Sequence, residues 1–582
     1  MQRKFHLGML VVLLATTTLA ACGPTSTASA KQDLRVLGDP SFYGASDLSP
    51  HIRALAGLGR LLWAPLVAHD DKWKPTADGL APAPDISADG LTYTFHLRKD
   101  AKYSDGTPVT AHDVEFDLRY DIMTGHPKVK GTRLLGTTAL RYYANVVGAA
   151  EVFDPKSTVT PNEFDAAPVS GVKATDDSTL QIQLVKQDPD FIFALMVDAP
   201  SAVKPSDIQR GKGKTYTNDQ YWTTEPGVAF SGPLALQSYT PNQGFTMVPN
   251  ANYYGAKVKL QHIAVTFVKD TATAITAFQN KEADWLDLPL SGADVQNVNT
   301  DTYLKSTLVQ AETYNVQQLF ITPYKPFDDI HVRRAVYMAI NKQSLADVLG
   351  GGAGQQFYSP IVSHVTNTDG CPGITSGLTP IAFDANAAKA ELAQSTYGTA
   401  VKDIPINIEL GLFGQDLTLN KVEAQFLQQA LQQTLGFTNV QIHQDTINDF
   451  NKPPFPYQLW TNAQGDREPD LYSFLNNLVP LIPALPIPAS GPSTLFTLPY
   501  APDVTNLMNQ AFAATTIDAR CKVLQKVLQT WVDQVVTIDL FTDKGYTLVA
   551  PWVKGLHTAN GSGGLEYLYL SPGLDSVSIA AH

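Results

Sequence analysis

The sequence contains little cysteine, little charge of either sign and no surplus of basic residues. Only 3 of its 582 residues are cysteine, and charged residues make up 17% of the chain, below the quarter that is usual in globular domains. Asp and Glu outnumber Lys and Arg by 55 to 42. Because a surface that binds nucleic acid has to be cationic, this balance speaks against nucleic acid as a partner.

Catalytic and metal-binding motifs are missing as well. The chain has no H-E-x-x-H, no C-x-x-C and no G-x-S-x-G, the patterns of zinc proteases, thiol redox sites and hydrolase nucleophiles. Residues 213–215 (Gly-Lys-Thr) are similar to the end of a phosphate loop, but Ile208 stands where that loop needs glycine. The three glycines at 350–352 follow the helix expected at 332–340, so we interpret them as a helix exit. We therefore expect no enzyme, no cofactor and no metal site.

The first residues predict a secretion signal with a lipid anchor. Arg3 and Lys4 precede an apolar run at 7–14, and residues 19–22 read Leu-Ala-Ala-Cys. This run is shorter than the roughly 20 apolar residues that span a membrane, no later segment is apolar enough to do so, and the run's end resembles a bacterial lipobox. We expect a lipoprotein signal peptide at 1–21, lipidation of Cys22 and a tether at 22–31. The alternative is an ordinary secretory signal in which the cysteine stands by chance.

Two cysteines, Cys371 and Cys521, remain beyond the signal. In an oxidising compartment two thiols can pair, provided that their Cα atoms lie within about 7 Å. Two separate thiols are the other interpretation, and the sequence leaves both open.

The length of the chain favours two or three lobes, and strands alternate with helices from residue 31 onward. Apolar and polar residues alternate at 91–97, which predicts a half-buried strand. Thr110, with Asp113 three residues later, predicts the start of a helix. Residues 172–184 have the pattern of a hairpin around Asp176-Asp177, and residues 263–286 that of a strand, a helix and a short strand.

A second region of the same kind lies later in the chain. It comprises an alternating strand at 406–412, a helix ended by Gly436 and a strand that begins at Val440. Parallel strands joined by helices build a covered sheet, so two such regions favour an α/β protein with two lobes. The proline-rich stretch at 478–492 is expected to be a loop.

Several segments resemble the solute-binding proteins of oligopeptide and dipeptide ABC importers. The most specific is 89–114, which contains DGLTYTFHLRKD and YSDGTPVTAHDV. Residues 231–234 (SGPL) and 250–255 (NANYYG) are similar to that family's Gly-Pro-Tyr and Asn-x-x-Tyr motifs. Residues 326–342 begin with PFDDIHVRRA and end with AINK. Residues 507–520 resemble a late helix, so the similarity spans nearly the whole mature chain.

The resemblance implies the fold class: α/β, a periplasmic-binding-protein-like clamshell of the class II type, with two lobes and an extra subdomain. Its implied segments are lobe I at 32–67, 169–313 and 545–582, an added subdomain of lobe I at 68–168, and lobe II at 314–544. The implied function is capture of di- or oligopeptides by hinge closure and their delivery to a membrane permease.

The resemblance also implies where the ligand binds. Peptide-binding members carry an aspartate, in a Trp-x-x-Asp-Tyr context, that pairs with the peptide's ammonium group. Asp466 is the best match, although Ala463 and Arg467 replace the two aromatic residues, and Arg467 would neutralise it. Two roles are therefore open for Asp466: it binds the ligand, or it caps a turn or pairs with Arg467. Two roles are also open for Trp460, which stacks on the ligand or fills the core. The further candidate contacts are Ser41, Phe42 and Tyr43 after the first strand, and Tyr314 and Asn315 near the lobe crossing.

The implied partners are a peptide or other small solute, ABC permease subunits and, through the lipid anchor, the bilayer. We expect a monomer at the outer side of the cell membrane. The altered context of Asp466 also allows a sugar, a metal chelate or haem in the same fold. Two more distant hypotheses are an envelope sensor lipoprotein and a secreted hydrolase, for which no residue suggests a site.

Overall fold

The computed structural model describes most of the chain after residue 30. The described residues are 31–40, 58–70, 74–129, 143–160, 165–188, 191–198, 200–212, 227–288, 290–322, 324–350, 371, 374, 378–379, 381–410, 417–444, 457–465, 475, 501–514, 516–556 and 573–582. The expected signal peptide, Cys22 and the expected proline-rich loop lie outside these residues.

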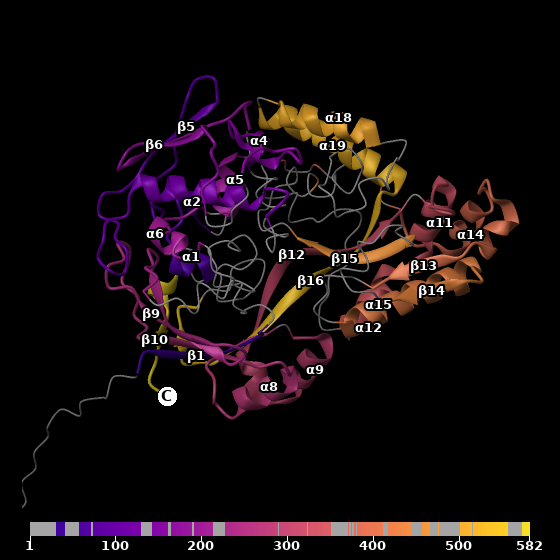
Figure 1. Ribbon diagram of the computed structural model, residues 1–582. Helices are drawn as coiled ribbons and strands as arrows, with labels where there is room; N and C mark the ends of the chain where they lie inside the picture. Colours follow the sequence, from indigo (N-terminus) through magenta and orange to yellow (C-terminus); the bar gives the residue numbers. More distant parts are fainter. Residues whose placement is uncertain are drawn as a thin grey trace, which may run out of the picture.

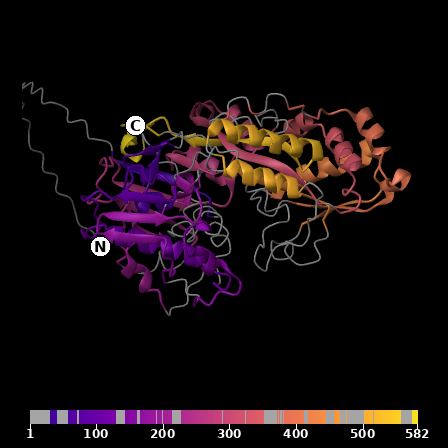
Figure 2. The same ribbon diagram turned by 90° about the horizontal axis from the view of Figure 1, so that it is seen from above.

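A ten-stranded sheet runs through both halves of the molecule (Figures 1 and 2). Its strand order is β14-β13-β15-β12-β16-β11-β1-β10-β9-β8. The strands are β1 (Asp33–Gly38), β8 (Leu234–Thr240), β9 (Gly244–Pro249), β10 (His262–Phe267), β11 (Trp285–Asp287), β12 (Leu308–Ile321), β13 (Ile406–Glu409), β14 (Val440–His443), β15 (Leu459–Gly465) and β16 (Thr537–Val549). β1 is parallel to β10 and β11, whereas β12 is antiparallel to β15 and β16.

Strands β12 and β16 carry the sheet from one half to the other, and they lie side by side at the centre of Figure 1. At one end Leu548 of β16 pairs with both Leu286 of β11 and Leu308 of β12. At the other end Phe320 of β12 pairs with Trp460 of β15. A continuous backbone ladder therefore connects strands on both sides of the crossing, which suits two rigid halves joined by a narrow ribbon.

The half that contains β1 and β8–β11 has its own core, and we call it lobe I. Apolar side chains of β1 and β10 pack with Phe278 and Trp285. The helices of this region are α1 (Leu58–Leu62), α6 (Pro205–Gln209), α8 (Thr271–Gln279), α9 (Gly292–Thr300) and α10 (Thr302–Thr307). The end of the chain closes this lobe, where β17 (Val553–Lys554) pairs with β18 (Ser578–Ile579).

A smaller sheet and its helices form the subdomain attached to lobe I. Its strand order is β4-β5-β7-β6. The elements are β4 (Asp85–Ile86), β5 (Thr92–His96), β6 (Val172–Asp176), β7 (Thr179–Gln183), α2 (Ala111–Thr124), α4 (Ala149–Phe153) and α5 (Phe191–Asp198), with the short pair β2 (Ala68–His69) and β3 (Pro75–Thr76) nearby. The sheet pairs β5 with β7, so a subdomain boundary at residue 168 separates two of its four strands from the others.

The half that contains β13–β15 is lobe II, whose sheet is covered on both faces. Leu319 and Ile321 belong to one apolar cluster and Phe320 to another, as expected for alternating side chains of a strand. The first cluster includes residues of α11 (Ile330–Ala339), α12 (Lys342–Gly350), α14 (Ala385–Leu392) and α15 (Leu417–Gln429). The second includes residues of α18 (Ala501–Phe512) and α19 (Ile517–Gln534), which lie side by side in Figure 1.

A disulfide joins Cys371 to Cys521 of α19, with Cα atoms 5.5 Å apart. The pairing that the sequence left open is therefore a covalent link in the structure. It attaches the segment around Cys371 to the face of lobe II that α18 and α19 cover.

Local predictions from the sequence are largely confirmed. The strands expected at 91–97 and 263–267 are β5 and β10, and the hairpin at 172–184 is β6 with β7. Asp113 accepts the backbone N–H of Thr110 at 2.8 Å, which closes the capping box of α2. Gly436 has φ +79° and ends the π-helical turn at Ala430–Leu435 that follows α15, a backbone conformation that glycine adopts most readily.

The interpretation of Gly350 was wrong in one respect. The helix with the apolar residues at 332–340 ends at Ala339, and a second helix, α12, runs on to Gly350. Asn341 separates them: its side-chain oxygen accepts the N–H of Ser344 at 3.0 Å and so begins the new helix, as capping asparagines do. Gly350 is therefore the last residue of α12, and Gly351 and Gly352 lie outside the described residues.

Candidate functional site

The candidate site residues suggested by the sequence fall into three groups. Ser41, Phe42, Tyr43, Asp466 and Arg467 lie outside the described residues. Tyr314 and Asn315 lie on β12, where the backbone is described. Trp460 is described in full.

Two of the candidate regions meet at the crossing of the lobes. Tyr314 and Asn315 lie in the stretch of β12 where its pairing with β16 is irregular, between Glu312 and Val316. Asn315 pairs with Gly465 of β15, the residue that precedes Asp466 in the chain. The register thus brings two segments 150 residues apart in sequence to one place beside the crossing, which makes this place the candidate functional site.

Trp460 fills the core of lobe II. Its ring stacks on Phe320 of the neighbouring strand, with centroids 4.1 Å apart and planes at 14°. Only 7% of the residue is exposed, and Val504 and Trp531 belong to the same apolar cluster. Of the two roles considered for Trp460, packing is the one that its surroundings support.

Buried polar side chains surround the lobe II end of the crossing. Nε2 of Gln317 donates to Oε2 of Glu423 at 2.8 Å, and Nε2 of Gln318 donates to Oδ1 of Asp539 at 2.5 Å. Lys342, also buried, donates to the hydroxyl of Tyr337 at 2.7 Å. Burial raises the pKa of Asp539 even though Gln318 and Lys342 oppose the shift, and burial lowers the pKa of Lys342.

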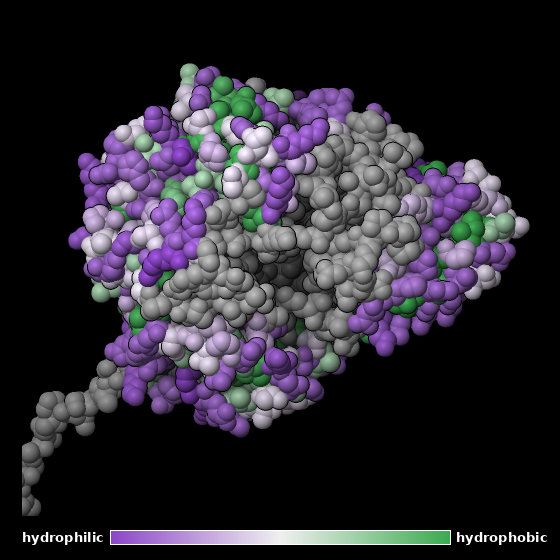
Figure 3. Space-filling model, viewed as in Figure 1, coloured by the Kyte–Doolittle hydropathy of each residue, from purple (hydrophilic) through white to green (hydrophobic). Residues whose placement is uncertain are grey.

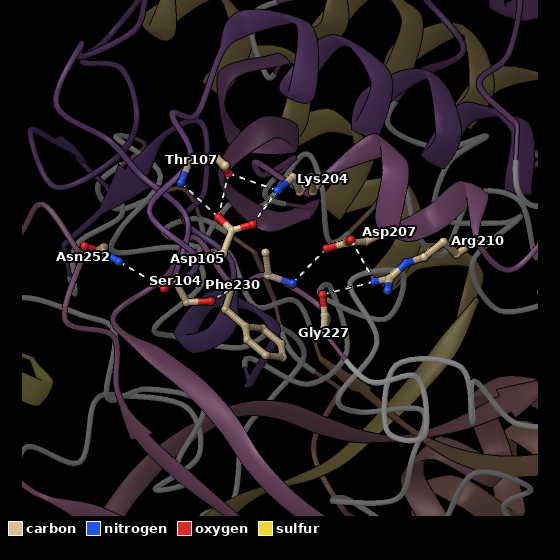
Figure 4. Close-up of polar contacts among 10 residues, drawn as sticks. Ser104, Asp105, Thr107, Lys204, Asp207, Arg210, Gly227, Phe230 and Asn252 are labelled. Atoms are coloured by element: carbon tan, nitrogen blue, oxygen red, sulfur yellow. Dashed lines mark hydrogen bonds and ion pairs between the residues drawn. The ribbon is translucent and has the colours of Figure 1, made fainter.

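Three motifs that carry the family resemblance, at 89–114, 231–234 and 250–255, converge at the junction of lobe I and its subdomain. Figure 4 shows Ser104 and Asn252 of two of these motifs together with Phe230. The N–H of Ser104 donates to the carbonyl of Phe230 at 2.8 Å, and the N–H of Phe230 donates back to Oγ of Ser104 at 3.1 Å. Nδ2 of Asn252 donates to the carbonyl of Ser104 at 3.0 Å. Asn250 donates to the carbonyls of Phe230 and Gly232 at 3.1 and 2.9 Å. These hydrogen bonds join three segments of the chain, and the residues that form them are partners of one another.

Charged pairs continue the same junction toward α6 (Figure 4). Nζ of Lys204 contacts Oδ2 of Asp105 at 2.5 Å. Although burial works in the other direction, hydrogen bonds from Lys204 and Thr107 lower the pKa of Asp105 to about 2. Arg210 donates to Asp207 at 2.8 Å, and Asp207 also accepts the N–H of Ala229 at 2.8 Å. The junction is therefore polar and ionic and is built to fix backbone segments.

Gly232 is required at this junction by close backbone approach. A Cβ atom at this position would lie 2.5 Å from the carbonyl oxygen of Leu61 and 2.7 Å from the carbonyl carbon of Leu62. The N–H of Gly232 donates to the carbonyl of Leu62 at 2.8 Å. A side chain would break this contact, so the glycine of this motif serves packing.

The motif at 326–342 has a comparable structural role in lobe II. Asp329 accepts the N–H of His331 and so caps α11, and it also accepts the N–H of Thr396 at 2.7 Å. Arg333 is buried and donates to the carbonyls of Phe327 and Gln534. The charged residues of this motif tie α11 to the segment that precedes β16.

The described residues contain no group of three or more His, Cys, Asp and Glu side chains arranged to hold a metal ion. Among those same residues, no helix has the length and apolar character needed to cross a membrane. Figure 3 shows a face with many hydrophilic side chains on both outer flanks.

The chain is similar to proteins of known families. Residues 76–480 match the model of the bacterial extracellular solute-binding proteins, family 5. The chain is 27% identical over 328 residues to heme-binding protein A of Haemophilus influenzae, covering 55% of this chain and 53% of that protein. It is 27% identical over 271 residues to the oligopeptide-binding protein OppA of Bacillus subtilis, covering 46% and 45%. The chain therefore spans about half the length of these curated relatives.

The fold is shared over almost the whole chain. The crystal structure of Haemophilus influenzae OppA in complex with the peptide RPPGFSPFR superimposes with a TM-score of 0.70 and 18% sequence identity, covering 95% of this chain and 99% of that one. This match confirms the expected α/β clamshell fold.

Proposed function

Since the chain belongs to family 5 of the bacterial extracellular solute-binding proteins, we propose that it captures a small solute between its two lobes and delivers it to an ABC permease. The observation that carries the proposal is the ribbon of β12 and β16, which joins the halves and is irregular at the crossing. Closure around a guest is favoured by contacts that exist only when both lobes touch it. The family consists of solute-binding proteins, so no catalytic step is involved.

Peptides are the cargo that we favour. One relative is named an oligopeptide-binding protein, and the superimposed crystal structure holds a peptide. Strand edges suit this cargo, because backbone hydrogen bonds to an extended peptide give affinity with little demand on its side chains. In this proposal Asp466 receives the terminal ammonium, and Tyr314, Asn315 and residues 41–43 contribute to the rim. A salt bridge between Asp466 and Arg467 would remove that ammonium site.

A second cargo class has an observation in its favour. The relative named for haem binding is as similar, at 27% identity, as the one named for oligopeptides, and its match is longer. Haem, a metal chelate or a sugar in the same fold is therefore the alternative. An envelope sensor with the same fold is the more distant one, and a genomic neighbourhood without permease and ATPase genes would favour it.

The proposal includes the membrane anchor and the division of the chain. Cys22 is proposed to carry the lipid that holds a monomer at the outer side of the cell membrane. Lobe II is proposed at 314–544, and the subdomain of lobe I is extended beyond 168 so that it includes β6 and β7. Cys22→Ser should move the protein from the membrane fraction to the soluble fraction of its host, and unchanged membrane attachment would contradict the anchor.

The cargo is tested with protein purified from its own host. Native mass spectrometry should show bound masses that fragment as peptides, and haem would be recognised by its own mass and absorbance. Thermal unfolding of emptied protein is then followed with a mixture of defined peptides and, separately, with haemin. Asp466→Asn should weaken stabilisation by peptides with a free N-terminus but not by N-acetylated ones. A protein that is empty when isolated and unaffected by either addition would contradict the proposal.

A further inference from the structure

The ribbon that joins the lobes is irregular over a short stretch. From Leu308 to Glu312 and again from Gln318 to Phe320, residues of β12 have consecutive partners on β16. Between Glu312 and Val316 β12 advances by 316 − 312 = 4 residues, while β16 advances by 544 − 542 = 2. Extra residues in one strand interrupt the ladder and bend the strand. A second, shorter irregularity lies between Gln317 and Gln318, where the partner on β16 changes from Phe541 to Asp539. The longer interruption, at residues 313–315, is therefore the part of the ribbon that we expect to bend most easily.

Two consecutive glutamines follow this bulge directly, and each is tied to a buried acid. Gln317 donates to Glu423 of α15 at 2.8 Å, and both residues are almost fully buried. Gln318, 1% exposed, donates to Asp539 of β16 at 2.5 Å and also to Oγ1 of Thr537 at 3.3 Å. A hydrogen bond to a carboxylate inside a protein is stronger than one between neutral groups. If it is lost, the buried carboxylate has no donor to replace water, and the folded state carries the full desolvation penalty of that acceptor.

The acid that binds Gln318 is itself embedded in lobe II. The ammonium of Lys342, at the start of α12, acts on Asp539 through its charge and lies 4.0 Å from the ring centroid of Tyr337 on α11. Trp531 of α19 donates to the same Thr537 hydroxyl at 3.0 Å. The two glutamines thus attach β12 to α15 and to the lobe II end of β16.

We propose that Gln317 and Gln318 are positioning residues of the hinge. By tying β12 to Glu423 and Asp539 immediately beyond the bulge, they make the strand from Val316 onward move rigidly with lobe II and confine bending to residues 313–315. The two glutamines influence solute capture without contacting the solute. They change the fraction of molecules in the conformation that can close, and the apparent affinity for solute is proportional to that fraction. The inference rests on the proposed function only in requiring that the two halves move.

The test measures the distance between the lobes in the absence of any solute. Spin labels are attached at Ala272→Cys on α8 and Ala390→Cys on α14, both exposed, in a chain carrying Cys22→Ser. Pulsed electron resonance then gives the distribution of interlobe distances. It is compared among the parent chain, Gln317→Met, Gln318→Met and the matched control Gln428→Met, whose side chain donates to the carbonyl of Val440 within lobe II at 2.8 Å.

Each anchor variant should broaden the distance distribution, whereas Gln428→Met should leave it unchanged. Hydrogen exchange of the amides at 316–320 should accelerate about tenfold in the anchor variants, which corresponds to about 1.4 kcal/mol. Glu423→Gln, which keeps an oxygen acceptor for Gln317 but removes its charge, should broaden the distribution less than Gln317→Met. Equal distributions in parent and Gln317→Met, or equal broadening in Gln428→Met, would overturn the inference.

These outcomes are separate from those of the cargo experiment. A protein that binds no solute but still shows the broadened distributions would contradict the proposed function and leave the hinge anchors standing. Gln317→Met alone is sufficient for the comparison if Gln318→Met lowers the yield of folded protein.

Discussion

Replacing Asn250 with aspartate should destabilise lobe I more than replacing it with alanine, although aspartate is nearly the same size. Nδ2 of Asn250 donates to the carbonyls of Phe230 and Gly232, and its Oδ1 accepts the N–H of Asn252 at 3.0 Å. The residue is buried. Aspartate would place a second oxygen against two carbonyl oxygens, so both former hydrogen bonds would become repulsive contacts.

The magnitude follows from these three hydrogen bonds. At about 1 kcal/mol each, Asn250→Ala should lower the free energy of unfolding by about 3 kcal/mol. In the variant the carbonyl of Phe230 still accepts the N–H of Ser104, at 2.8 Å in the parent structure. This remaining hydrogen bond limits the loss of stability. Asn250→Asp adds an ionised group without a cationic partner among these contacts, so its cost at neutral pH should exceed that of alanine. Protonation would restore one donor, and Asn250→Asp should therefore regain stability as the pH falls toward 5.

Urea unfolding, read by hydrogen exchange of the amides of β8 and β9, measures the effect within lobe I, because a protein of several lobes need not unfold in one step. Asn297→Asp is the matched control, since its side chain is exposed on α9, and its effect should stay within about 0.5 kcal/mol. Asn250→Asp with the stability of the parent, or with a stability independent of pH, would refute the reasoning. Solute affinity of the folded variants should be unchanged, because this motif serves the junction.

Burial opposes ionisation of Asp284, but the hydrogen bonds that Asp284 accepts from Arg35 outweigh burial and lower the pKa of Asp284. The stability that the ionised Asp284 contributes should be present above about pH 4 and disappear below it. Asp284→Asn should therefore flatten this part of an acid unfolding curve. Replacing Cys371 and Cys521 together by serine opens a link across 150 residues, and by loop entropy the free energy of unfolding should fall by at most about 5 kcal/mol, measured by urea unfolding under non-reducing conditions. Trp460→Ala should lower the stability of lobe II by about 3–5 kcal/mol as followed by calorimetry, and an unchanged melting profile combined with lost solute affinity would instead assign Trp460 to the site.

Elements whose determinants are local could be predicted from the sequence. The alternation in β5 and the spacing of Thr110 and Asp113 depend on neighbouring residues alone, and the structure has both as expected. The break between α11 and α12 was missed, because the apolar pattern continues across it. Asn341 was the available signal, since asparagine is a preferred capping residue.

The crossing of the lobes could not be predicted from local patterns, and only the family resemblance indicated its place near Tyr314 and Asn315. Its two strands, β12 and β16, are more than two hundred residues apart in sequence, and each also pairs with a strand from another part of the chain, β15 and β11 respectively. Glutamine is usually found on protein surfaces, yet both Gln317 and Gln318 are buried. Their partners Glu423 and Asp539 come from distant parts of the chain, so no spacing rule connects them.

The residues of lobe I that carry the family resemblance serve the packing of its junction. Ser104 and Asn250 belong to the recognisable motifs, and both form hydrogen bonds with Phe230, which directly precedes the motif at 231–234. Both Nδ2 protons of Asn250 and both lone pairs of the Phe230 carbonyl are used in these contacts, so these groups are not available to a solute. We therefore expect substitutions beside the crossing of β12, where Tyr314 and Asn315 lie, to change the cargo without changing the fold.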